Sequence, residues 1–281
     1  MVLCKGLQYI VLIGCSLLIW IPLYMVIAGS LIGPVDIQDY IGAALGTKKE
    51  YVNWPLFPLY PTLRSYVKLL LDSPKFFVMF GNSVKQVVPA IIGQLIIAVP
   101  AAWSFSRFRF PGKRFLFGIY MILMLLPFQV TMVSSYFILN QVQLLNTHWA
   151  MILPAIFSTF PVFIMVKFFI SIPEEMMEAA KIDGAGHFTT FLRIGIPLGY
   201  SGVMSALIIS FLELWNALEQ PLTFLRDKSY WPLSLYLPQI ATDEVGVSFI
   251  ASILMMLPAL LIFLNGESYL EQGIVASGIK Q

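Results

Sequence analysis

The chain has 281 residues, of which 58% are hydrophobic and only 11% are charged, and its formal net charge is +2. Soluble domains carry about a quarter charged residues, so this composition excludes an ordinary soluble domain and indicates an integral membrane protein. The small net charge gives no indication of a nucleic-acid partner. The two cysteines, Cys4 and Cys15, lie at or within the first apolar segment, where they predict neither a disulfide framework nor a metal site.

Six stretches are apolar over about the 20 residues that a helix needs to cross the hydrocarbon core of a membrane. They lie near Tyr9–Ile32, Phe77–Phe105, Phe115–Leu139, Trp149–Ile170, Leu198–Leu218 and Val247–Leu264. The first is too long for the core of a signal peptide, so we expect an uncleaved span. The predicted fold class is therefore all-α, a polytopic membrane protein with six transmembrane helices. We expect residues 1–76 to form the first helix and an extracytoplasmic loop, and residues 77–281 to form a core of five helices.

Proline residues interrupt several of these spans. Membrane helices tolerate such kinks when neighbouring groups satisfy the freed carbonyls. The prolines are Pro89, Pro100, Pro127, Pro154, Pro161 and Pro258. We expect kinked helices at these positions.

One short loop predicts the orientation of the chain. It carries Arg107, Arg109, Lys113 and Arg114 with no acidic residue among them. Short loops rich in Lys and Arg stay on the cytoplasmic side. Six spans then place both termini in the cytoplasm, together with the polar segment Ser171–Pro197.

That segment is a charge-dense island between two apolar stretches. Ser171 and Glu174 have the spacing of a capping box, with Pro173 in the first turn of the helix. Glu174 and Glu175 would oppose the positive end of the helix dipole. Gly184 suits a left-handed stop and a sharp turn into a second short helix. From these residues alone, the island is either a surface loop with a short amphipathic helix or a helix–turn–helix that is offered to a partner outside the bilayer.

The residue pattern of the island resembles the EAA signature of ABC-importer permeases, EAA-x3-G-x9-I-x-L-P. The matching residues are Glu178, Ala179, Ala180, Gly184, Ile194 and Pro197, and Ile196 stands where the signature has Leu. The longer form of sugar permeases, P-x-E-L-x-EAA-x-IDGA, is similar to Pro173–Ala185. The island is thus identified with the cytoplasmic coupling helix, or EAA loop, of that family.

Other blocks extend the resemblance from about Phe77 to Lys280. Asn82–Val84 and Ala101–Lys113 resemble the start and end of one span in sugar permeases of the maltose-type MalG class. The chain departs from the family at Ala217, where Trp-Asn-Asp is usual, at Gly199–Val203 and at Ser134–Ser135. These departures do not affect the assignment to the permease class. They do weaken any inference of this chain's substrate from the substrates of the family.

The resemblance implies a binding-protein-dependent importer in a bacterial inner membrane. Its other parts would be a second permease, a cytoplasmic ABC ATPase dimer and an extracytoplasmic solute-binding protein, with a sugar as cargo. The ATPase-coupling residues would be Glu178, Ala179, Ala180, Asp183, Gly184, Ile194 and Pro197. The chain has no GxxxxGK[ST], so it is expected to be no enzyme itself, to bind no cofactor, and to leave ATP hydrolysis to a partner.

Polar residues within the apolar spans are candidates for the substrate path, because they are costly to expose to lipid. The candidates are Glu213, Trp215, Asn216, Gln129 and Gln94, with Asn140 as a further one. Sugars bind to flat aromatic faces and to amide or carboxylate groups, and Glu213, Trp215 and Asn216 combine these. The alternative is helix–helix hydrogen bonding.

Two other classes of protein were weighed. A membrane enzyme would show a motif such as HExxH or GxSxG, and neither occurs. A stand-alone secondary transporter would show charged pairs at mid-membrane and often an inverted repeat, and neither is visible. Within the importer class, a glycerol-phosphate ester or a polyol is the alternative cargo.

Overall fold

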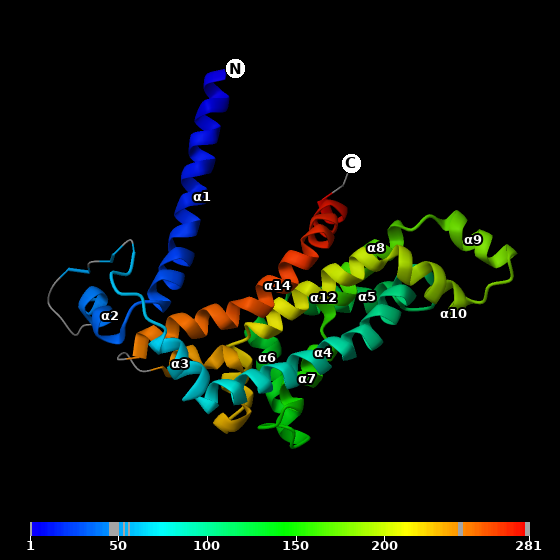
Figure 1. Ribbon diagram of the computed structural model, residues 1–281. Helices are drawn as coiled ribbons and strands as arrows, with labels where there is room; N and C mark the ends of the chain where they lie inside the picture. Colours follow the sequence, from blue (N-terminus) through cyan, green and yellow to red (C-terminus); the bar gives the residue numbers. More distant parts are fainter. Residues whose placement is uncertain (1, 45–50, 53, 56, 241–243, 279–281) are drawn as a thin grey trace. The chain divides into compact units, whose positions relative to one another are not determined.

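The computed structural model describes residues 2–44, 51–52, 54–55, 57–240 and 244–278. Within these residues the regular secondary structure is entirely helical, with no β-strand (Figure 1). The all-α fold class is confirmed. The chain forms two compact units, residues 1–78 with 235–257 and residues 79–234 with 258–281.

Four helices in the described residues are long and apolar enough to cross a membrane. They are Gln8–Ser30, Pro74–Arg107, Trp149–Ser171 and Val245–Glu271. Two pairs of shorter helices pass the same test together, but each pair is bent at a short break. Counting each bent pair as one span gives up to six spans. The first pair coincides with the third predicted span, whereas the fifth predicted span corresponds only to the second helix of the other pair, Tyr200–Trp215.

The sharper bend, 106°, separates α5 (Lys113–Leu125) from α6 (Phe128–Gln141) at Pro127. A proline disfavours helical backbone at the residue before it, and Leu126 is accordingly extended, with ψ 140°. Pro89, Pro100 and Pro258, by contrast, lie inside continuous helices, in α4 (Pro74–Arg107) and α14 (Val245–Gly278). Only some of the predicted interruptions therefore break a helix.

The first unit contains α1 (Val2–Ser30), α2 (Pro34–Ile41), α3 (Arg64–Leu71), the start of α4, the turn η4 (Leu237–Gln239) and the start of α14. Among the side chains of α1 whose burial the structure describes, residues 8–30, only those at the C-terminal end are packed. Gly29 lies so close to Phe249 that an added Cβ would approach its ring to 2.7 Å. The Oγ of Ser30 lies 2.9 Å from the Oη of Tyr66. Residues 8–22 of α1 are exposed, as expected for a helix that faces lipid or another protein.

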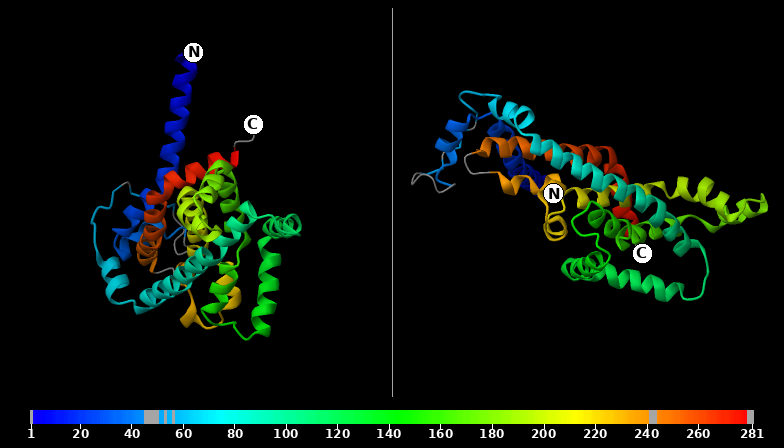
Figure 2. Two further views of the ribbon diagram at one scale, coloured as in Figure 1. Left: turned by 90° about the vertical axis from the view of Figure 1, so that its right-hand side faces the viewer. Right: turned by 90° about the horizontal axis from the view of Figure 1, so that it is seen from below.

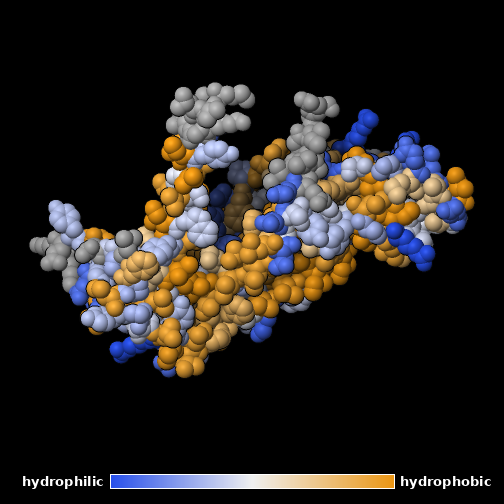
Figure 3. All heavy atoms as spheres, turned by 45° about the horizontal axis from the view of Figure 1, so that its top comes forward, coloured by the Kyte–Doolittle hydropathy of each residue, from blue (hydrophilic) through white to orange (hydrophobic). Residues whose placement is uncertain are grey.

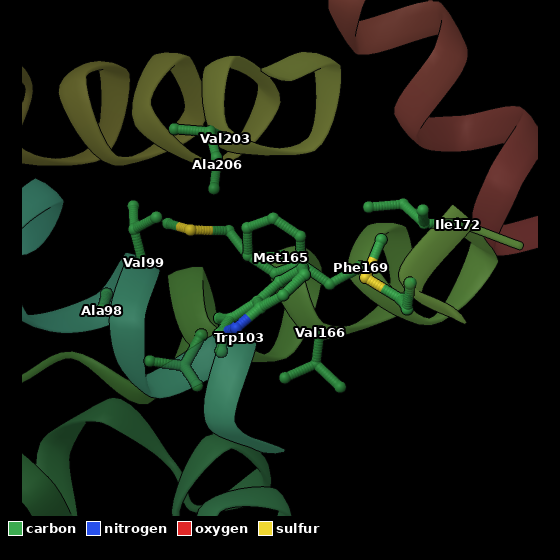
Figure 4. Close-up of a cluster of buried hydrophobic side chains, with 12 residues drawn as sticks. Ala98, Val99, Trp103, Met165, Val166, Phe169, Ile172, Val203 and Ala206 are labelled. Atoms are coloured by element: carbon green, nitrogen blue, oxygen red, sulfur yellow. The ribbon is translucent and has the colours of Figure 1, made fainter. Parts of the chain in front are cut away.

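The second unit has its core between α8 (Thr159–Ser171), α12 (Tyr200–Trp215) and the end of α4. Figure 4 shows this core, in which Met165, Phe169 and Ala206 are fully buried. Two glycines at the start of α12 permit the close approach. An added Cβ at Gly199 or Gly202 would lie 2.3 Å from the nearest ring atom of α8.

Helix α5 packs on α8 beside this core. Helices α7 (Trp149–Ile156) and α13 (Glu219–Phe224) contact one another and form a separate buried cluster with the end of α6. The turns η2 (Lys228–Tyr230) and η3 (Leu233–Leu235) follow α13 along the chain. The end of α14 is tied to α12 by the Oγ of Ser205, which donates to the carbonyl of Tyr269 at 2.5 Å. Figure 2 shows the long helices of this unit from two further sides.

The loop that follows α13, residues 225–234, is held by side chains from residues 82–86 of α4. The amide of Asn82 donates to the carbonyls of Ser229 and Trp231, and the amide of Gln86 donates to that of Tyr230. The Oγ of Ser83 accepts from the backbone of the same loop at 2.8 Å. Polar residues at the start of an apolar span therefore serve to fix this loop, which we call the 225–234 loop.

Candidate functional site

The polar island forms a helical hairpin between α8 and α12. Its arms are α9 (Glu174–Ile182) and α10 (His187–Thr190), and we call residues 174–190 the α9–α10 hairpin. The chain then returns through a π-helical turn, Phe191–Gly195, and a short helix α11, Ile196–Leu198. Figure 1 shows the hairpin projecting beyond the end of α8.

The hairpin starts differently from the predicted capping box. Ser171 is the last residue of α8, and its Oγ donates to the carbonyl of Phe168 at 2.7 Å. Pro173 precedes α9 instead of lying in its first turn, and no side chain caps the helix. The prediction is wrong because a proline pushes the residue before it out of helical backbone, so Ile172 is extended and helix can resume only at Glu174.

The charges of α9 follow the helix dipole, as predicted. Glu174 and Glu175 occupy the first turn, and Lys181 occupies the last turn. Acidic groups at the N-terminus and basic groups at the C-terminus each stabilise an exposed helix by about 0.3–1 kcal/mol. Favourable end charges help a helix of only 9 residues to persist at the surface.

The predicted stop at Gly184 is confirmed. Gly184 has φ +78°, a left-handed conformation that glycine adopts without cost. The backbone N–H of Ala185 donates to the carbonyl of Ala180, and that of Gly184 donates to the carbonyl of Lys181. This pair of bonds is a Schellman motif, which fixes the direction in which the chain leaves α9.

The two faces of α9 have different surroundings. Met177 and Ala180 are buried against the rest of the second unit. Glu178, Ala179 and Ile182 lie on the opposite face and are exposed. The two alanines of the motif thus have separate positions: Ala180 permits close packing within the chain, and Ala179 leaves a smooth outer surface.

Two exposed apolar side chains on the hairpin were not found by sequence reasoning. Ile182 is 86% exposed and Phe188 is 72% exposed. Figure 3 shows apolar and hydrophilic side chains mixed at this end of the unit. Ile182 belongs to the sugar-permease motif quoted above, so the sequence drew attention to this residue. The motif does not show which face of α9 its side chain occupies.

The return arm packs on Trp103 of α4. Gly195 lies so close that an added Cβ would approach this indole ring to 2.6 Å, and Phe191 has its ring centroid 5.6 Å from that of Trp103. Ile194 is half-buried against the same cluster, whereas Pro197 is exposed. The base of the hairpin is therefore built on the end of α4.

Seen as one set, the predicted coupling residues occupy one short stretch of surface and its base. Five of these residues are exposed, namely Glu178, Ala179, Asp183, Gly184 and Pro197. The other two, Ala180 and Ile194, are packed inward. Arg107, which the sequence indicated only as one charge of the basic loop, contacts the base of the hairpin. Its Nη2 donates to the carbonyls of Phe169 and Ile172 at the end of α8.

The predicted path residues are not brought together. Gln94 is buried, and its amide donates to the carbonyl of Ala155 at 2.8 Å, a helix–helix hydrogen bond. Gln129 and Asn140 are exposed on α6, near its two ends. Glu213 is exposed on α12. None of these four residues lines either of the two recesses described below.

Trp215 and Asn216 also differ from the expected sugar-binding pair. Trp215 is buried, with its ring stacked on Phe211 and edge-on to Phe80. It lines a recess of about 280 Å³ between α4, α12 and α14, whose lining side chains are all apolar. The amide of Asn216 donates back to the carbonyl of Leu212 in its own helix. Residues two apart on a helix, such as Glu213 and Trp215, point about 200° apart, which explains why they do not converge.

His148 lies just before α7 and is half-buried. Its Nδ1 is 3.2 Å from the Nε2 of Gln86, and its ring is edge-on to Tyr230. Burial lowers the pKa of His148, and the nearby charge of Lys85 lowers this pKa further. The neutral ring thus helps to support the 225–234 loop. No three His, Cys, Asp or Glu side chains in the described residues lie close enough to hold a metal ion.

Comparison with known proteins gives consistent matches. The model of a family described as "binding-protein-dependent transport system inner membrane component" matches residues 94–276, which include the whole hairpin. A probable ABC transporter permease protein of Pyrococcus horikoshii is 31% identical over 262 residues, covering 89% of this chain and 95% of that protein.

Two further matches are informative. The arabinooligosaccharides transport system permease protein AraQ of Halalkalibacterium halodurans is 26% identical over 222 residues, covering 78% of this chain and 80% of that protein. Among solved structures, a chain of a bacterial ABC transporter involved in the import of the acidic polysaccharide alginate has a TM-score of 0.78. It is 19% identical and covers 95% of this chain and 96% of that chain, a likeness of fold.

Proposed function

The chain belongs to the family of binding-protein-dependent transport system inner membrane components, and from this premise we propose that it is the permease subunit of an ABC importer for a sugar or oligosaccharide. It is a multi-pass membrane protein of that family. Its partners in the proposed complex are a second permease, a cytoplasmic ABC ATPase dimer and an extracytoplasmic solute-binding protein. Residues 77–281 form the core permease domain in this proposal, and residues 1–76 supply the first helix and an extracytoplasmic loop.

The observation that carries the proposal is the α9–α10 hairpin. A short helix with stable ends and an exposed outer face, Glu178, Ala179 and Ile182, suits insertion into a cleft of an ATPase. The Schellman motif at Gly184 gives the hairpin a fixed shape, so that movement of the ATPase is passed to α8 and α12 as a whole. The proposed coupling residues are Glu178, Ala179, Ala180, Asp183, Gly184, Ile194 and Pro197.

A sugar is the cargo that the observations favour. AraQ, which shares most of its length with this chain, is named for the transport of arabinooligosaccharides. A glycerol-phosphate cargo would favour Arg or Lys near mid-membrane, and none is apparent in the sequence. The proposed path residues stay the same: Glu213, Trp215, Asn216, Gln129 and Gln94. Because they lie apart from one another, we propose that the sister permease completes any binding site.

The proposal places both termini and the hairpin in the cytoplasm. The cluster Arg107, Arg109, Lys113 and Arg114 supports this orientation. The ATPase contact then lies on the side where ATP is available.

The test compares two single substitutions in the hairpin. Gly184→Asp forces a residue with Cβ into φ +78°, which costs about 1–2 kcal/mol, and adds negative charge at the negative end of α9. Gly186→Asp adds the same charge where φ is −72°, at the N-cap of α10, where aspartate is favourable. Both glycines have open space around the position of an added Cβ.

A tagged chain would be purified gently from native membranes, and its partners would be identified by mass spectrometry. We expect a second permease and an ATPase to accompany the wild type and Gly186→Asp. We expect Gly184→Asp to stay in the membrane, to lose the ATPase and to lower sugar uptake about tenfold or more. Normal uptake by Gly184→Asp would refute the coupling role, and a wild-type chain that purifies without an ATPase would refute the importer.

A further inference from the structure

Arg107 joins the end of α4 to the end of α8. Its Nη2 donates to the carbonyls of Phe169 and Ile172, the groups that a helix end leaves without an intrahelical partner. A cation at this end also opposes the negative pole of the helix dipole. Arg107 therefore fixes the point from which the hairpin departs.

The guanidinium of Arg107 rests on the ring of Trp103, with its Cζ 5.8 Å from the ring centroid. The same ring contacts both ends of the hairpin. Its centroid is 5.3 Å from that of Phe169, before the hairpin, and 5.6 Å from that of Phe191, after it. Figure 4 shows Trp103 and Phe169 pointing toward one another. A displacement of Phe169 or Phe191 would therefore move the ring on which the guanidinium of Arg107 rests.

One donor of Arg107 has no acceptor. The Nε is buried and makes no hydrogen bond. The side chain of Arg107 lines a small recess of about 90 Å³, whose other lining residues include Met177, Glu174, Lys181 and His187. The carboxylate of Glu174 acts electrostatically on the guanidinium, yet no ion pair joins the two side chains in the described part of the chain.

We propose that Arg107 is a positioning residue that pairs with Glu174 through its Nε when the hairpin closes over this recess. This inference rests on the proposed function and deepens it. In the arrangement described here, the guanidinium holds only the carbonyls of α8. When the ATPase moves the hairpin inward, the carboxylate of Glu174 reaches the unused N–H. The pair then ties the hairpin to α4, so that α4 moves with α8 and α12.

The assignment is independent of the EAA signature. Glu174 occupies a variable position of the sugar-permease motif, and its side chain, although exposed, lines the recess beside Arg107. Arginine suits this exchange because its planar fork binds a carboxylate and carbonyl groups at the same time. A lysine would supply the charge without the Nε donor.

The test is a double-mutant cycle on the complete importer in proteoliposomes. The readout is sugar transported per ATP hydrolysed, together with co-purification of the ATPase. The variants are Arg107→Gln, Glu174→Gln and the double substitution, with Arg107→Lys as the conservative one. Arg109→Gln removes a neighbouring exposed charge and is the control for Arg107, and Lys181→Gln is the control for the other cation of the recess.

We expect Arg107→Gln and Glu174→Gln each to lower the transport-to-ATP ratio about tenfold, the size of a lost charge-assisted hydrogen bond. The double variant should be no worse than the poorer single variant, because one interaction is lost in all three. Arg107→Lys should restore little of the ratio. Both control variants should couple normally, and the ATPase should co-purify with every variant.

Three results would overturn the inference. Normal coupling by Glu174→Gln would leave Arg107 as a cap of α8 alone, and this variant decides the question even if Arg107→Gln fails to assemble. Additive losses in the double variant would show separate roles. An equal loss in Lys181→Gln would make Lys181 the partner of Glu174. Failure of the proposed function is distinct, since the wild type would then not couple at all.

Discussion

At the scale of single residues, Gly199 and Gly202 set how closely α12 approaches α8. The positions where an added Cβ would collide face the rings of Phe169 and Phe168, so small residues on one helix compensate large ones on the other. Small residues at contacts between membrane helices let the backbones approach, and van der Waals packing then drives association. This explains one departure from the family pattern, where Gly199–Val203 replaces Pro-Ala-Leu.

Gly202→Ala is expected to destabilise the protein. The new Cβ would lie 2.3 Å from the Cγ of Phe168, and overpacking of this kind costs about 1–3 kcal/mol. Gly118→Ala in α5 is the matched control, because nothing lies within 4 Å of its added Cβ, and alanine is the better helix former by up to about 1 kcal/mol. Thermal unfolding in detergent measures both. A Gly202→Ala protein as stable as wild type would contradict the packing described here.

Prediction of single residues succeeded where one residue type determines the backbone conformation. Gly184 could be predicted because a left-handed stop strongly favours glycine, and the structure has φ +78° there. The capping box at Ser171 failed because two local rules competed. Pro173 excluded Ile172 from helical backbone, and the serine joined the preceding helix. Arg107 could be seen only as a charge, since its partners are backbone groups 62 and 65 residues away.

At the scale of elements, the 225–234 loop and residues 82–86 of α4 form one hydrogen-bonded assembly. Asn82 and Gln86 use their amides on loop carbonyls, and His148 supports Gln86 from a third segment. Buried backbone carbonyls need such donors when no regular ladder supplies them. The loop is therefore expected to keep its shape when the spans beneath it move.

The assembly should loosen in acid. Burial and Lys85 lower the pKa of His148, so the folded state favours the neutral ring, whose Nδ1 can accept from the amide of Gln86. This contribution is complete above the ordinary value of 6.5 and is lost as the pH falls through the lower folded pKa. Hydrogen exchange of residues 225–234 at about pH 5 and about pH 7.5, corrected for intrinsic rates, should show less protection in acid.

His148→Gln is the control for this experiment, because glutamine does not titrate. Its loop should show the same protection at both pH values. Equal protection of the wild-type loop at both pH values would exclude His148 as a support that depends on protonation.

Hydropathy predicted where most helices lie but not how they bend. Four of the predicted spans correspond to helical stretches that are long and apolar enough to cross a membrane, since about 20 apolar residues suffice to identify them. One of these stretches is interrupted between α7 and α8. The 106° break at Pro127 and the 70° bend before α12 depend on packing that hydropathy does not register. The predicted substrate-path residues do not lie together for a related reason. The polarity of a residue shows that it is costly to expose to lipid, but it does not show on which face of its helix the side chain lies.

At the scale of the whole molecule, the proposed topology predicts which residues a reagent can reach. Leu59 is exposed and precedes α4, and Arg109 is exposed in the basic loop after α4. In a chain with Cys4 and Cys15 replaced by serine, Leu59→Cys should react with a membrane-impermeant maleimide in intact cells. Arg109→Cys should react only after permeabilisation, because the proposed topology places the basic loop in the cytoplasm.

The reverse labelling pattern would place the hairpin outside and remove the basis for ATPase coupling. Labelling of both sites in intact cells would indicate leaky cells, which a cytosolic marker protein detects in the same samples. The count of apolar spans cannot replace this measurement, since each bent pair could count as one span or as none.

The π-helical turn Phe191–Gly195 gives the hairpin an evolutionary constraint of a particular kind. A π-turn holds one residue more than an α-helical turn, and each residue of a helix turns the chain by about 100°. Loss or gain of one residue between Gly184 and Pro197 would rotate α12 against the hairpin and carry Gly199 and Gly202 away from the rings that they face. We therefore expect that this stretch tolerates most substitutions better than the insertion or deletion of a single residue.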